Sequence, residues 1–476
     1  MRPRSGARPS GLAILAFAAC LPAALGLVVP LSAEEPIPIG SRLELFVDDY
    51  LIEELTGGAG QQLHKPAPGE VVLVTDQPWE GNTCAYYVIF QDGELYRMYY
   101  RGSHFDTKTR RASHPEFACY AESRDGVHWT KPELGLFEFN GSKQNNIVRQ
   151  GVGTHDFTPM KDANPGCPPE ARYKALGRGS HGYKHGLYAF QSPDAIHWKL
   201  MSEEPVITNG AFDSQNLAFY DTVRGRYVEF HRGFRAGVRD IMTCTSDDFL
   251  HWTGPVWLEY PDAPKEHLYT NAIRPYFRAP QIFLGFPTRY HPERGSQVEP
   301  TLMTSRDGQT FHRRTEALIP VTAPEDRQGN RSNYMAWGLV ALPGNDRELS
   351  VYATEAYYTG SDSRLRRFTY RVDGFVSVHA PAGGGELLTR PMVFQGGELV
   401  INFATAAAGS VCVEIRDADG NPLPGFSLAE SKEISGDRIE QVVAWQNGSD
   451  VSSLAGKPVR LRFVIEDADL YSIRFR

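Results

Sequence analysis

The sequence predicts an all-β protein in which a repeated sheet unit forms most of the chain. Four short segments share the pattern Ser-x-Asp-x-x-(His/Thr)-aromatic and recur roughly every 55 to 70 residues, a period typical of propeller blades. Short β-like runs lie between them, joined by turn residues such as Asp92-Gly93. The four segments are residues 123–129, 192–198, 246–252 and 305–311. We therefore expect a five-bladed β-propeller over residues 70–380, followed by a C-terminal β-sandwich over residues 386–476.

Each expected blade holds at least two strands before its Ser-x-Asp turn. The strands expected in blades one to five include residues 85–91 and 95–101, 173–177 and 186–191, 217–221 and 226–232, 273–277 and 281–287, and 334–342 and 348–355. Blade five ends in Asp373-Gly374-Phe375, which we interpret as a degenerate copy of the turn. The repeated Asp is expected to accept hydrogen bonds from turn amides, and the aromatic residue to pack between blades.

The two ends of the chain differ from the repeats. Residues 1–33 are typical of a secretory signal peptide, with early arginines, an apolar run over 11–29 and small residues before the expected cleavage point. A single membrane anchor is the alternative. Residues 34–69 are expected to form an N-terminal strand segment that packs on the propeller. The C-terminal sandwich is either a carbohydrate-binding module or a stabilising appendage. The expected location is secreted or periplasmic.

Composition excludes some partners. The 476-residue chain has a formal net charge of −8, so no basic surface for nucleic acid is expected. No membrane association is expected after signal cleavage. Five cysteines remain after cleavage, and one bridge, with Cys84 and Cys119 as a candidate pair, is compatible with an oxidising compartment. No Cys-x-x-Cys occurs, and neither a metal nor a cofactor is expected. The sequence does not indicate the oligomeric state.

These features together resemble a known group of enzymes. Secreted five-bladed propellers with Ser-x-Asp-Gly-x-x-Trp turns are similar to glycoside hydrolase families 32, 43, 68 and 130, over about residues 70–380. The chain also resembles an uncharacterised group of secreted bacterial proteins, through residues 46–52, 162–165, 172–175 and 467–472. The turn is not the sialidase Asp-box, because Gly126 and Gly308 directly follow the Asp.

The resemblance implies one carboxylate on the innermost strand of each of the first three blades. Glycoside hydrolysis needs two carboxyls about 5 to 9 Å apart, one ionised and one protonated. The candidates are Glu80 as base or nucleophile, Asp162 as orienting residue, with Asp156 nearby, and Asp213 as acid or its partner. Family 32 has Asp on blade one and Glu on blade three, the reverse of this chain, so fructan chemistry is disfavoured. The alternative for each residue is a turn cap or a surface carboxylate.

Other polar and aromatic residues near the expected inner strands are candidates for substrate binding. Arginines at these positions can hold uronate, sulfate or hydroxyl groups, or form ion pairs between blades. Tyr and Trp can stack on a sugar ring or pack in the core. These candidates are Arg101, Arg232, Tyr269, Asn271, Arg289 and Trp337. His155 and His181 are candidate bases or ligands, with surface or core roles as the alternative.

The sequence thus favours a secreted carbohydrate-active enzyme, a glycoside hydrolase with an oligo- or polysaccharide substrate. A non-catalytic glycan-binding propeller is the main alternative. A third interpretation is an enzyme that uses sulfate, phosphate or a metal in the same pocket. The sugar, the linkage and the stereochemical outcome are left open, because propeller folds host many functions.

Overall fold

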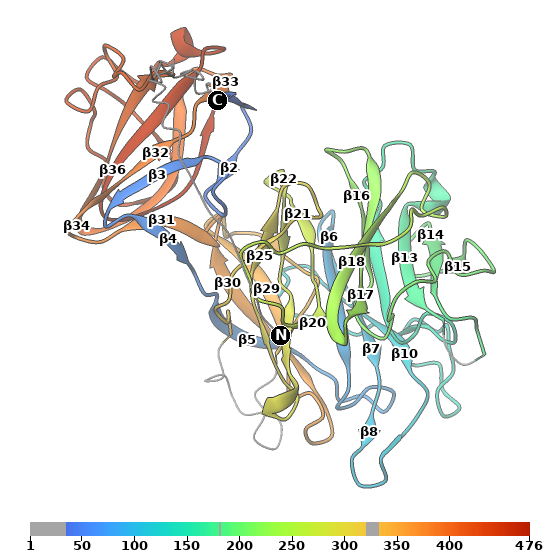
Figure 1. Cartoon of the computed structure of the whole chain (residues 1–476). Helices are drawn as coiled ribbons and strands as arrows, with labels where there is room; N and C mark the ends of the chain where they lie inside the picture. Colours follow the sequence, from blue (N-terminus) through green and yellow to red (C-terminus); the bar gives the residue numbers. More distant parts are fainter. Residues whose placement is uncertain (1–34, 180–181, 320–332) are drawn as a thin grey trace, which may run out of the picture. The chain divides into compact units, whose positions relative to one another are not determined.

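The computed structural model describes residues 35–179, 182–319 and 333–476, and these are almost entirely β structure (Figure 1). Half of the chain is strand and 2% is helical, as the sequence predicts. The helices are single 3-10 turns: η1 (Pro169–Ala171), η2 (Pro292–Arg294) and η3 (Ser452–Leu454). Within the described residues, no helix has the length and apolarity needed to span a membrane. The expected signal peptide lies outside the described residues.

Residues Pro36–Arg476 form one compact unit, and its first three sheets follow one another along the chain. Each has four antiparallel strands in sequential order. Module one contains β6 (Ala85–Asp92), β7 (Leu95–Gly102), β10 (Phe117–Ser123) and β11 (Ile147–Arg149). Module two contains β12 (Phe157–Lys161), β13 (Tyr173–Arg178), β14 (Leu187–Ser192) and β15 (Lys199–Leu200). Module three contains β16 (Leu217–Asp221), β17 (Arg226–Arg235), β18 (Val238–Ser246) and β19 (Val256–Trp257).

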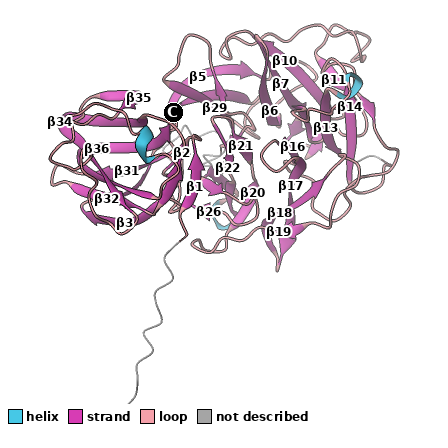
Figure 2. Cartoon of the chain, turned by 90° about the horizontal axis from the view of Figure 1, so that it is seen from above, coloured by secondary structure: helices cyan, strands magenta, loops and turns pink. Residues whose placement is uncertain are grey.

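Module four is divided into two sheets. One contains β20 (His267–Thr270), β23 (Thr288–His291) and β24 (Gln297–Pro300). The other contains β21 (Arg274–Tyr276), β22 (Ala279–Gly285), β25 (Met303–Ser305) and β26 (His312–Arg313). A two-stranded hairpin, β8 (Phe105–Asp106) with β9 (Arg111–Ala112), extends from module one. Figure 2 shows the sheets of the modules from above.

Module five combines strands from both halves of the chain. Its strands are β27 (Tyr334–Met335), β28 (Val340–Ala341), β29 (Glu348–Glu355), β30 (Arg364–Arg371) and, from the N-terminal region, β5 (Ala67–Val74). Strand β5 pairs antiparallel with β30 and is the outermost strand of this sheet. Because this pairing joins segments about 300 residues apart in sequence, it closes the series of modules, as outer strands do in closed repeats.

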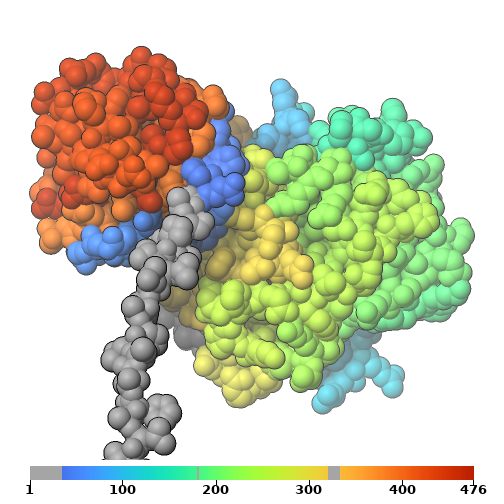
Figure 3. Space-filling view, turned by 45° about the horizontal axis from the view of Figure 1, so that its top comes forward, coloured from blue at the N-terminus to red at the C-terminus, as the bar shows by residue number. Residues whose placement is uncertain are grey.

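The remaining strands form one ten-stranded sheet. From the N-terminal region it takes β1 (Ile37–Gly40), β2 (Glu44–Leu45), β3 (Ile52–Gly57) and β4 (Gly60–Leu63). From the C-terminal region it takes β31 (Val376–Ala380), β32 (Gly385–Thr389), β33 (Met392–Phe394), β34 (Leu399–Asp417), β35 (Asp437–Val442) and β36 (Val459–Phe475). Figure 3 shows the N-terminal residues, in blue, against the orange and red C-terminal residues. The sheet therefore begins before residue 386 in sequence and incorporates part of the N-terminal segment.

The N-terminal segment also contacts module four. Arg306 forms ion pairs with Glu44 and Asp48, each at 2.7 Å. Leu45 and Val47 belong to the same apolar core as the modules, while Phe46 packs in the core of the ten-stranded sheet. Residues 44–48 thus contact the modules, while strands β1 to β4 of the same segment pair in the C-terminal sheet, because alternate side chains of residues 45–47 face different cores.

The four Ser-x-Asp turns have one common geometry. In the turn after β18, the Ser246 hydroxyl donates to Asp248 and accepts from the backbone N–H of Phe249. Asp248 Oδ1 accepts from the N–H groups of Leu250 and His251. The residue after the Asp has a φ of 70 to 81° in all four turns, so a left-handed conformation is common to them. The expected structural role of the repeat is thereby observed.

The degenerate fifth copy is different. Asp373 makes none of those turn contacts, and its buried carboxylate instead accepts hydrogen bonds from side chains of module four and of the ten-stranded sheet. The donors are Tyr276, Arg278, Asn402 and Ser472. Asp373 is therefore a cross-link between sheets, which corrects its interpretation as a turn copy.

The expected bridge between Cys84 and Cys119 is absent, because the five described cysteines are free thiols. Both Cys84 and Cys119 are buried in the apolar core of module one, and burial raises the pKa of each. They therefore act as small apolar core residues.

Candidate functional site

Polar and aromatic side chains gather where the first strands of the modules begin, and we call this group the polar end. It combines arginines, carboxylates, one histidine and several tyrosines. Its members are Tyr86, Arg101, Glu116, His155, Asp156, Asp213, Arg232, Tyr269, Tyr334 and Tyr357. The tyrosine rings pack in a chain, with centroids 5.6 Å apart for Tyr269 and Tyr334 and 5.3 Å apart for Tyr334 and Tyr357.

Arg101, on β7, connects three parts of the polar end. Its Nη2 donates to the Thr83 carbonyl at 2.8 Å and to the Tyr357 hydroxyl at 2.9 Å. Its Nη1 lies 3.7 Å from Glu116 Oε1. The guanidinium carbon lies 4.9 Å from the centre of the Tyr86 ring, within the range of a cation–π interaction. The predicted ligand-binding residue Arg101 is thus held rigidly at this end.

Arg232 and Asp213 form the most accessible charged pair of the polar end. Arg232, near the end of β17, donates to Asp213 Oδ1, and the Asp213 side chain is 49% exposed. Two further guanidinium nitrogens of Arg232 are buried with no partner among the described residues. The guanidinium carbon lies 4.9 Å from the Tyr269 ring centre, and Tyr86 donates to the Asp213 carbonyl at 3.2 Å. Three of the predicted residues, Asp213, Arg232 and Tyr269, are therefore brought together.

Asp156 supplies a second carboxyl with different chemistry. It immediately precedes β12 and is fully buried, and burial raises its pKa well above the ordinary value. Its Oδ2 accepts from Asn216 at 2.5 Å, whereas Oδ1 has no partner among the described residues. Asn216 also donates to the carbonyls of Phe212 and Ser214, on either side of Asp213. The Asn216 amide thus connects the buried Asp156 carboxyl to the segment that carries the exposed Asp213 side chain.

His155 lies between the arginine and the carboxylates. Its Nδ1 is 2.9 Å from Glu116 Oε2, and its Nε2 is 3.5 Å from Arg101 Nη1. Burial lowers the pKa of His155, although Glu116 opposes this effect. A neutral imidazole at this position can accept or relay a proton. His181, the other histidine candidate, lies outside the described residues.

Glu80 is placed elsewhere. Its carboxylate is buried in module one, where Oε1 accepts from the Tyr100 hydroxyl at 2.5 Å and Oε2 pairs with Lys131 Nζ at 2.6 Å. The Gln77 N–H donates to it as well. Burial raises its pKa, which Lys131 opposes. These partners surround Glu80, and none of them belongs to the polar end.

Asp162 follows β12, at the opposite end of that strand from Asp156. Its carboxylate pairs with Lys174 and accepts from the Tyr227 hydroxyl at 2.6 Å, and it caps the turn at the Asn164 N–H. The three predicted carboxylates therefore have separate sets of partners, and the structure brings only Asp213 to the polar end.

The remaining predicted residues differ in their exposure and in their hydrogen-bond partners. Asn271 is buried, and its amide donates to the backbone carbonyls of Gln215 and Phe230 at 3.4 and 3.3 Å. Tyr269 is partly exposed and packs against Tyr290 with ring centroids 5.8 Å apart. Tyr269 is thus a partly exposed ring that also contacts the Arg232 guanidinium, while Asn271 holds the backbone between modules three and four.

Arg289 and Trp337 are likewise engaged. Arg289 pairs with Glu266 at 3.0 Å and with Glu299 at 2.5 Å, so it bridges two carboxylates in module four. Trp337 donates from Nε1 to the Ile273 carbonyl at 2.8 Å. Arg289 therefore forms ion pairs, which is the alternative to ligand binding that the sequence left open. Trp337 lines a cavity at the opposite end of the first strands from the polar end.

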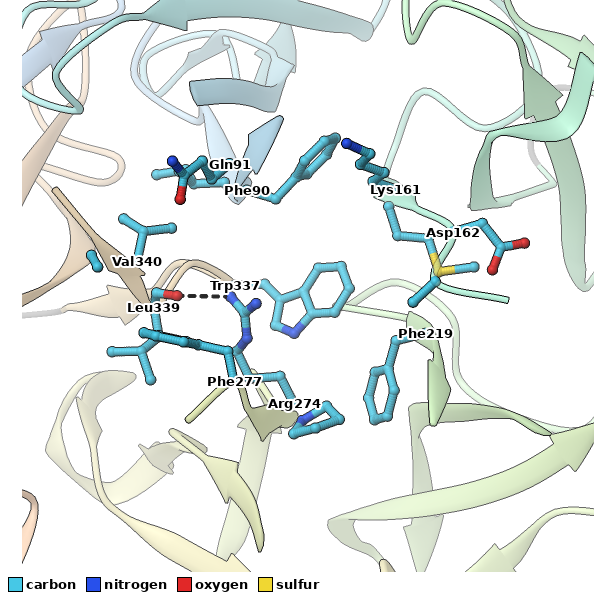
Figure 4. A pocket seen from close by; sticks show the side chains of 15 residues that line it. Phe90, Gln91, Lys161, Asp162, Phe219, Arg274, Phe277, Trp337, Leu339 and Val340 are labelled. Atoms are coloured by element: carbon cyan, nitrogen blue, oxygen red, sulfur yellow. Dashed lines mark hydrogen bonds between the residues drawn. The ribbon is translucent and has the colours of Figure 1, made fainter. Parts of the chain in front are cut away.

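That cavity has a volume of about 480 Å³ and is largely apolar (Figure 4). It lies where β6 and β12 end rather than where they begin, and every module contributes to it. Its lining is Ile89, Phe90, Gln91, Met160, Lys161, Asp162, Ala163, Phe219, Arg274, Pro275, Phe277, Trp337, Leu339, Val340 and Ala341. Since a strand advances about 3.3 Å per residue, Tyr86 and Gln91 on β6 are roughly 16 Å apart along the strand. The cavity and the polar end are thus separate sites.

One buried group of side chains has the composition of a metal site. Glu229, His231 and Cys244 place one ligand atom each within 4.8 Å of one another. His231 Nδ1 is 2.7 Å from Glu229 Oε2, and its Nε2 is 2.9 Å from the Asn209 carbonyl. Both ring nitrogens of His231 are therefore already hydrogen-bonded. The group is a buried Glu–His pair with a neighbouring thiol.

Sequence reasoning missed several residues of the polar end. Glu116, Tyr86 and Tyr357 carry no motif, and they lie on different segments of modules one and five. Asp156 was noted only as a neighbour of Asp162. Its position directly before β12 is a usable signal, since Asp213 also lies shortly before the first strand of its module.

Comparisons with known proteins find fold-level similarity. No family model matches the chain. Two uncharacterized proteins of Mycobacterium tuberculosis, from strains CDC 1551 and H37Rv, are each 28% identical over 155 residues, or 32% of this chain. The match spans 44% of the length of those relatives.

The solved structures to which the chain is similar include propeller-fold glycoside hydrolases. A thermostable family-43 glycoside hydrolase has 13% identity and a TM-score of 0.44, covering 67% of this chain and 96% of its own. An N-acetylgalactosamine deacetylase from F. plautii, in complex with blood group B trisaccharide, has 14% identity and a TM-score of 0.46, covering 67% and 97%. A β-1,2-mannobiose phosphorylase from Listeria innocua has 11% identity and a TM-score of 0.43, covering 69% and 97%.

Proposed function

We propose that this chain is a secreted carbohydrate-active enzyme, specifically a glycoside hydrolase, whose active site is the polar end. The observation that carries the proposal is the pair of unlike carboxyls there. Asp213 is half exposed and paired with Arg232, while Asp156 is buried with a raised pKa. Two carboxyls in opposite protonation states are what glycoside hydrolysis requires.

The roles follow from these environments. Asp213, which is paired with Arg232, is the proposed base or nucleophile, and Asp156, whose pKa is raised by burial, is the proposed proton donor through its unpartnered Oδ1. Tyr269, the partly exposed tyrosine of the polar end, is the proposed ring for contact with a sugar. The unpartnered nitrogens of Arg232 offer donors for hydroxyl, uronate or sulfate groups. Glu80 and Asp162 have no part in this scheme, because their carboxylates are engaged elsewhere.

The fold proposed for this function is a five-bladed propeller with a C-terminal β-sandwich. Modules one to five are the proposed blades, and the ten-stranded sheet is the proposed sandwich. Three features support this reading: all five modules contribute residues to one cavity, β5 closes module five, and the long strands β34 and β36 pair along most of their length. Export from the cell is proposed from residues 1–33, and a mature chain that begins at Glu34 is the expected mass-spectrometric result.

A panel of aryl furanosides and pyranosides tests the activity. We expect the wild-type protein to release aglycone from at least one member, and Asp213→Asn and Asp156→Asn to lower kcat on that substrate by about 100-fold or more. Asp247→Asn is the matched control, because Asp247 is exposed in a turn remote from the polar end. Unchanged turnover in either carboxyl variant would remove that residue from the mechanism.

A non-catalytic glycan-binding protein is the second candidate, and one observation favours it. Asp156 has no exposed surface, so a substrate reaches its Oδ1 only if neighbouring groups move. Saturable binding of an oligosaccharide without turnover, measured by calorimetry across the same sugars, would support this candidate over the hydrolase.

A further inference from the structure

We propose that the cavity at the far end of the first strands binds a small carboxylate with an apolar, aromatic body, and that Arg274 is its counter-charge. This site is separate from the polar end and does not depend on the hydrolase proposal. Its walls and its single uncompensated cation define the ligand class.

Arg274 lies on β21 and lines the cavity. Its Nη1 donates to the Leu339 carbonyl at 3.2 Å, a contact drawn in Figure 4. Its Nε is buried with no partner, and no described carboxylate forms an ion pair with it. Arg274 is partly buried, and a partly buried charge without an opposite charge is unfavourable, so a bound anion at this guanidinium would be favourable. Burial lowers the pKa of Arg274 to about 10, which still leaves it charged at neutral pH.

The other charged side chains of the cavity are already compensated. Lys161 pairs with Asp92 at 2.8 Å, and Asp162 pairs with Lys174. Neither pair removes the positive charge of Arg274, and neither adds a competing free carboxylate. An anion that enters the cavity therefore has one strong partner, which can bind a carboxylate through two parallel hydrogen bonds.

The walls favour an apolar body over a sugar. Phe90, Phe219 and Trp337 line the space, and Figure 4 shows the Trp337 indole beside Arg274. Apart from Gln91, the lining side chains with polar groups are committed to the ion pairs and the carbonyl contact described above. The hydroxyls of a sugar acid would largely lack partners here, and unpaired buried hydroxyls oppose binding. The volume of about 480 Å³ lies within the range of small-molecule sites.

The test uses 2-naphthoate and its neutral isostere 2-naphthamide with the full mature chain. Tryptophan fluorescence and calorimetry report binding, since Trp337 is part of the wall. We expect the wild-type protein to bind the carboxylate at least tenfold more tightly than the amide. Arg274→Met is expected to abolish that preference, Arg274→Lys to retain part of it, and Arg124→Met, which removes an arginine that is 80% exposed, to leave it unchanged.

Several results would overturn the proposal. They are equal affinity of the wild-type protein for the two naphthalene probes, no saturable binding at millimolar concentration, retention of the preference in Arg274→Met, or tighter binding of galacturonate than of 2-naphthoate. The comparison of acid and amide on the wild-type protein stands even if a variant fails to fold. Asp213→Asn is expected to bind 2-naphthoate normally, so failure of the hydrolase proposal and failure of this one are distinguishable.

Discussion

At the polar end, Arg101 and Arg232 each have a carboxylate neighbour, Glu116 and Asp213, whereas at the cavity end Arg274 has only a backbone carbonyl. The same first strands connect the two ends. The polar end is thus nearly neutral and rich in hydrogen-bonding groups, and the cavity is apolar with one excess positive charge. This difference teaches that the two ends are suited to different ligands: a polar, hydroxyl-rich one and a small apolar anion.

Removal of the Trp337 side chain, which lines the cavity, is expected to have the largest effect on stability. Trp337 is 6% exposed, packs against Phe219 and hydrogen-bonds to Ile273, and it pairs with Val88 midway along β6. Trp337→Ala is expected to lower the free energy of unfolding by about 3 to 5 kcal/mol, because it leaves a large void. Urea unfolding measures this. Trp337→Phe keeps an aromatic ring and is expected to cost less than half as much, and equal losses would show that packing is not the cause.

The buried Glu80 and the partly buried Arg274 sharpen the comparison, because removal of the two charges is expected to have different effects on stability. Glu80→Gln removes the partner of Lys131 and is expected to lower the free energy of unfolding by about 3 kcal/mol, as breaking a buried pair does. Arg274→Met removes a charge that has no partner and is expected to be neutral or stabilising. Both are read from urea midpoints.

The matched control for Glu80 is Glu94→Gln, which changes a 95% exposed carboxylate and is expected to leave the midpoint unchanged. Destabilisation by Arg274→Met equal to that of Glu80→Gln would mean that Arg274 is compensated after all. The rate of hydrolysis per folded molecule is expected to be unchanged in Glu80→Gln. If Glu80 were the nucleophile, this substitution would abolish hydrolysis.

The sequence predicted well what depends on neighbours in the chain. The Ser-x-Asp turns follow from residues within seven positions of each other, and the strands next to them were placed within a few residues. It predicted poorly what depends on distant partners. Lys131, which neutralises Glu80, lies 51 positions away, and the four partners of Asp373 come from three separate segments.

The same dependence on partners that are distant in sequence explains which residues of the polar end could be predicted. Asp213 and Tyr269 were predicted because each lies close to the first strand of a module, and Arg232 because it ends an expected strand of module three. Glu116 was missed because β10 brings it to Arg101 from the outer part of module one. Pairing of the N-terminal strands with the C-terminal sheet was also missed, since alternation indicates a strand but does not identify its neighbour.

The turn after β18, which contributes no residue to the polar end or to the lining of the cavity, offers a pair of adjacent aspartates that tests whether the turns only support the sheets. Asp248→Ala removes an acceptor of two backbone N–H groups and is expected to cost about 1 to 2 kcal/mol of unfolding free energy. Asp247→Ala, one residue earlier and exposed, is expected to stay within about 0.5 kcal/mol of the wild type. Neither change is expected to alter ligand binding at either end. Altered binding of 2-naphthoate or of a glycan by Asp248→Ala would show that the turns do more than support the sheets.

The smallest expected effect is a pH dependence that comes from the polar end. Burial raises the pKa of Asp156 above its ordinary value of 3.8, while Asn216, Arg101 and Arg178 oppose this in part. The folded protein therefore holds this proton more tightly than the unfolded chain does, and its contribution to stability is fully present below pH 3.8. That contribution is lost as the pH rises from 3.8 through the raised folded-state pKa.

Asp156→Asn keeps the shape of the side chain without an ionisable group, so it isolates this effect. Its Tm is expected to match the wild type near pH 4 and to exceed it by about 1 to 3 °C near pH 7, by differential scanning calorimetry. Asp247→Asn is expected to show no such divergence. The opposite trend, with the wild type gaining stability over Asp156→Asn as the pH rises, would mean that Asp156 is ionised in the folded protein. Asp156 could then not be the proton donor, which would have to be sought in Glu116.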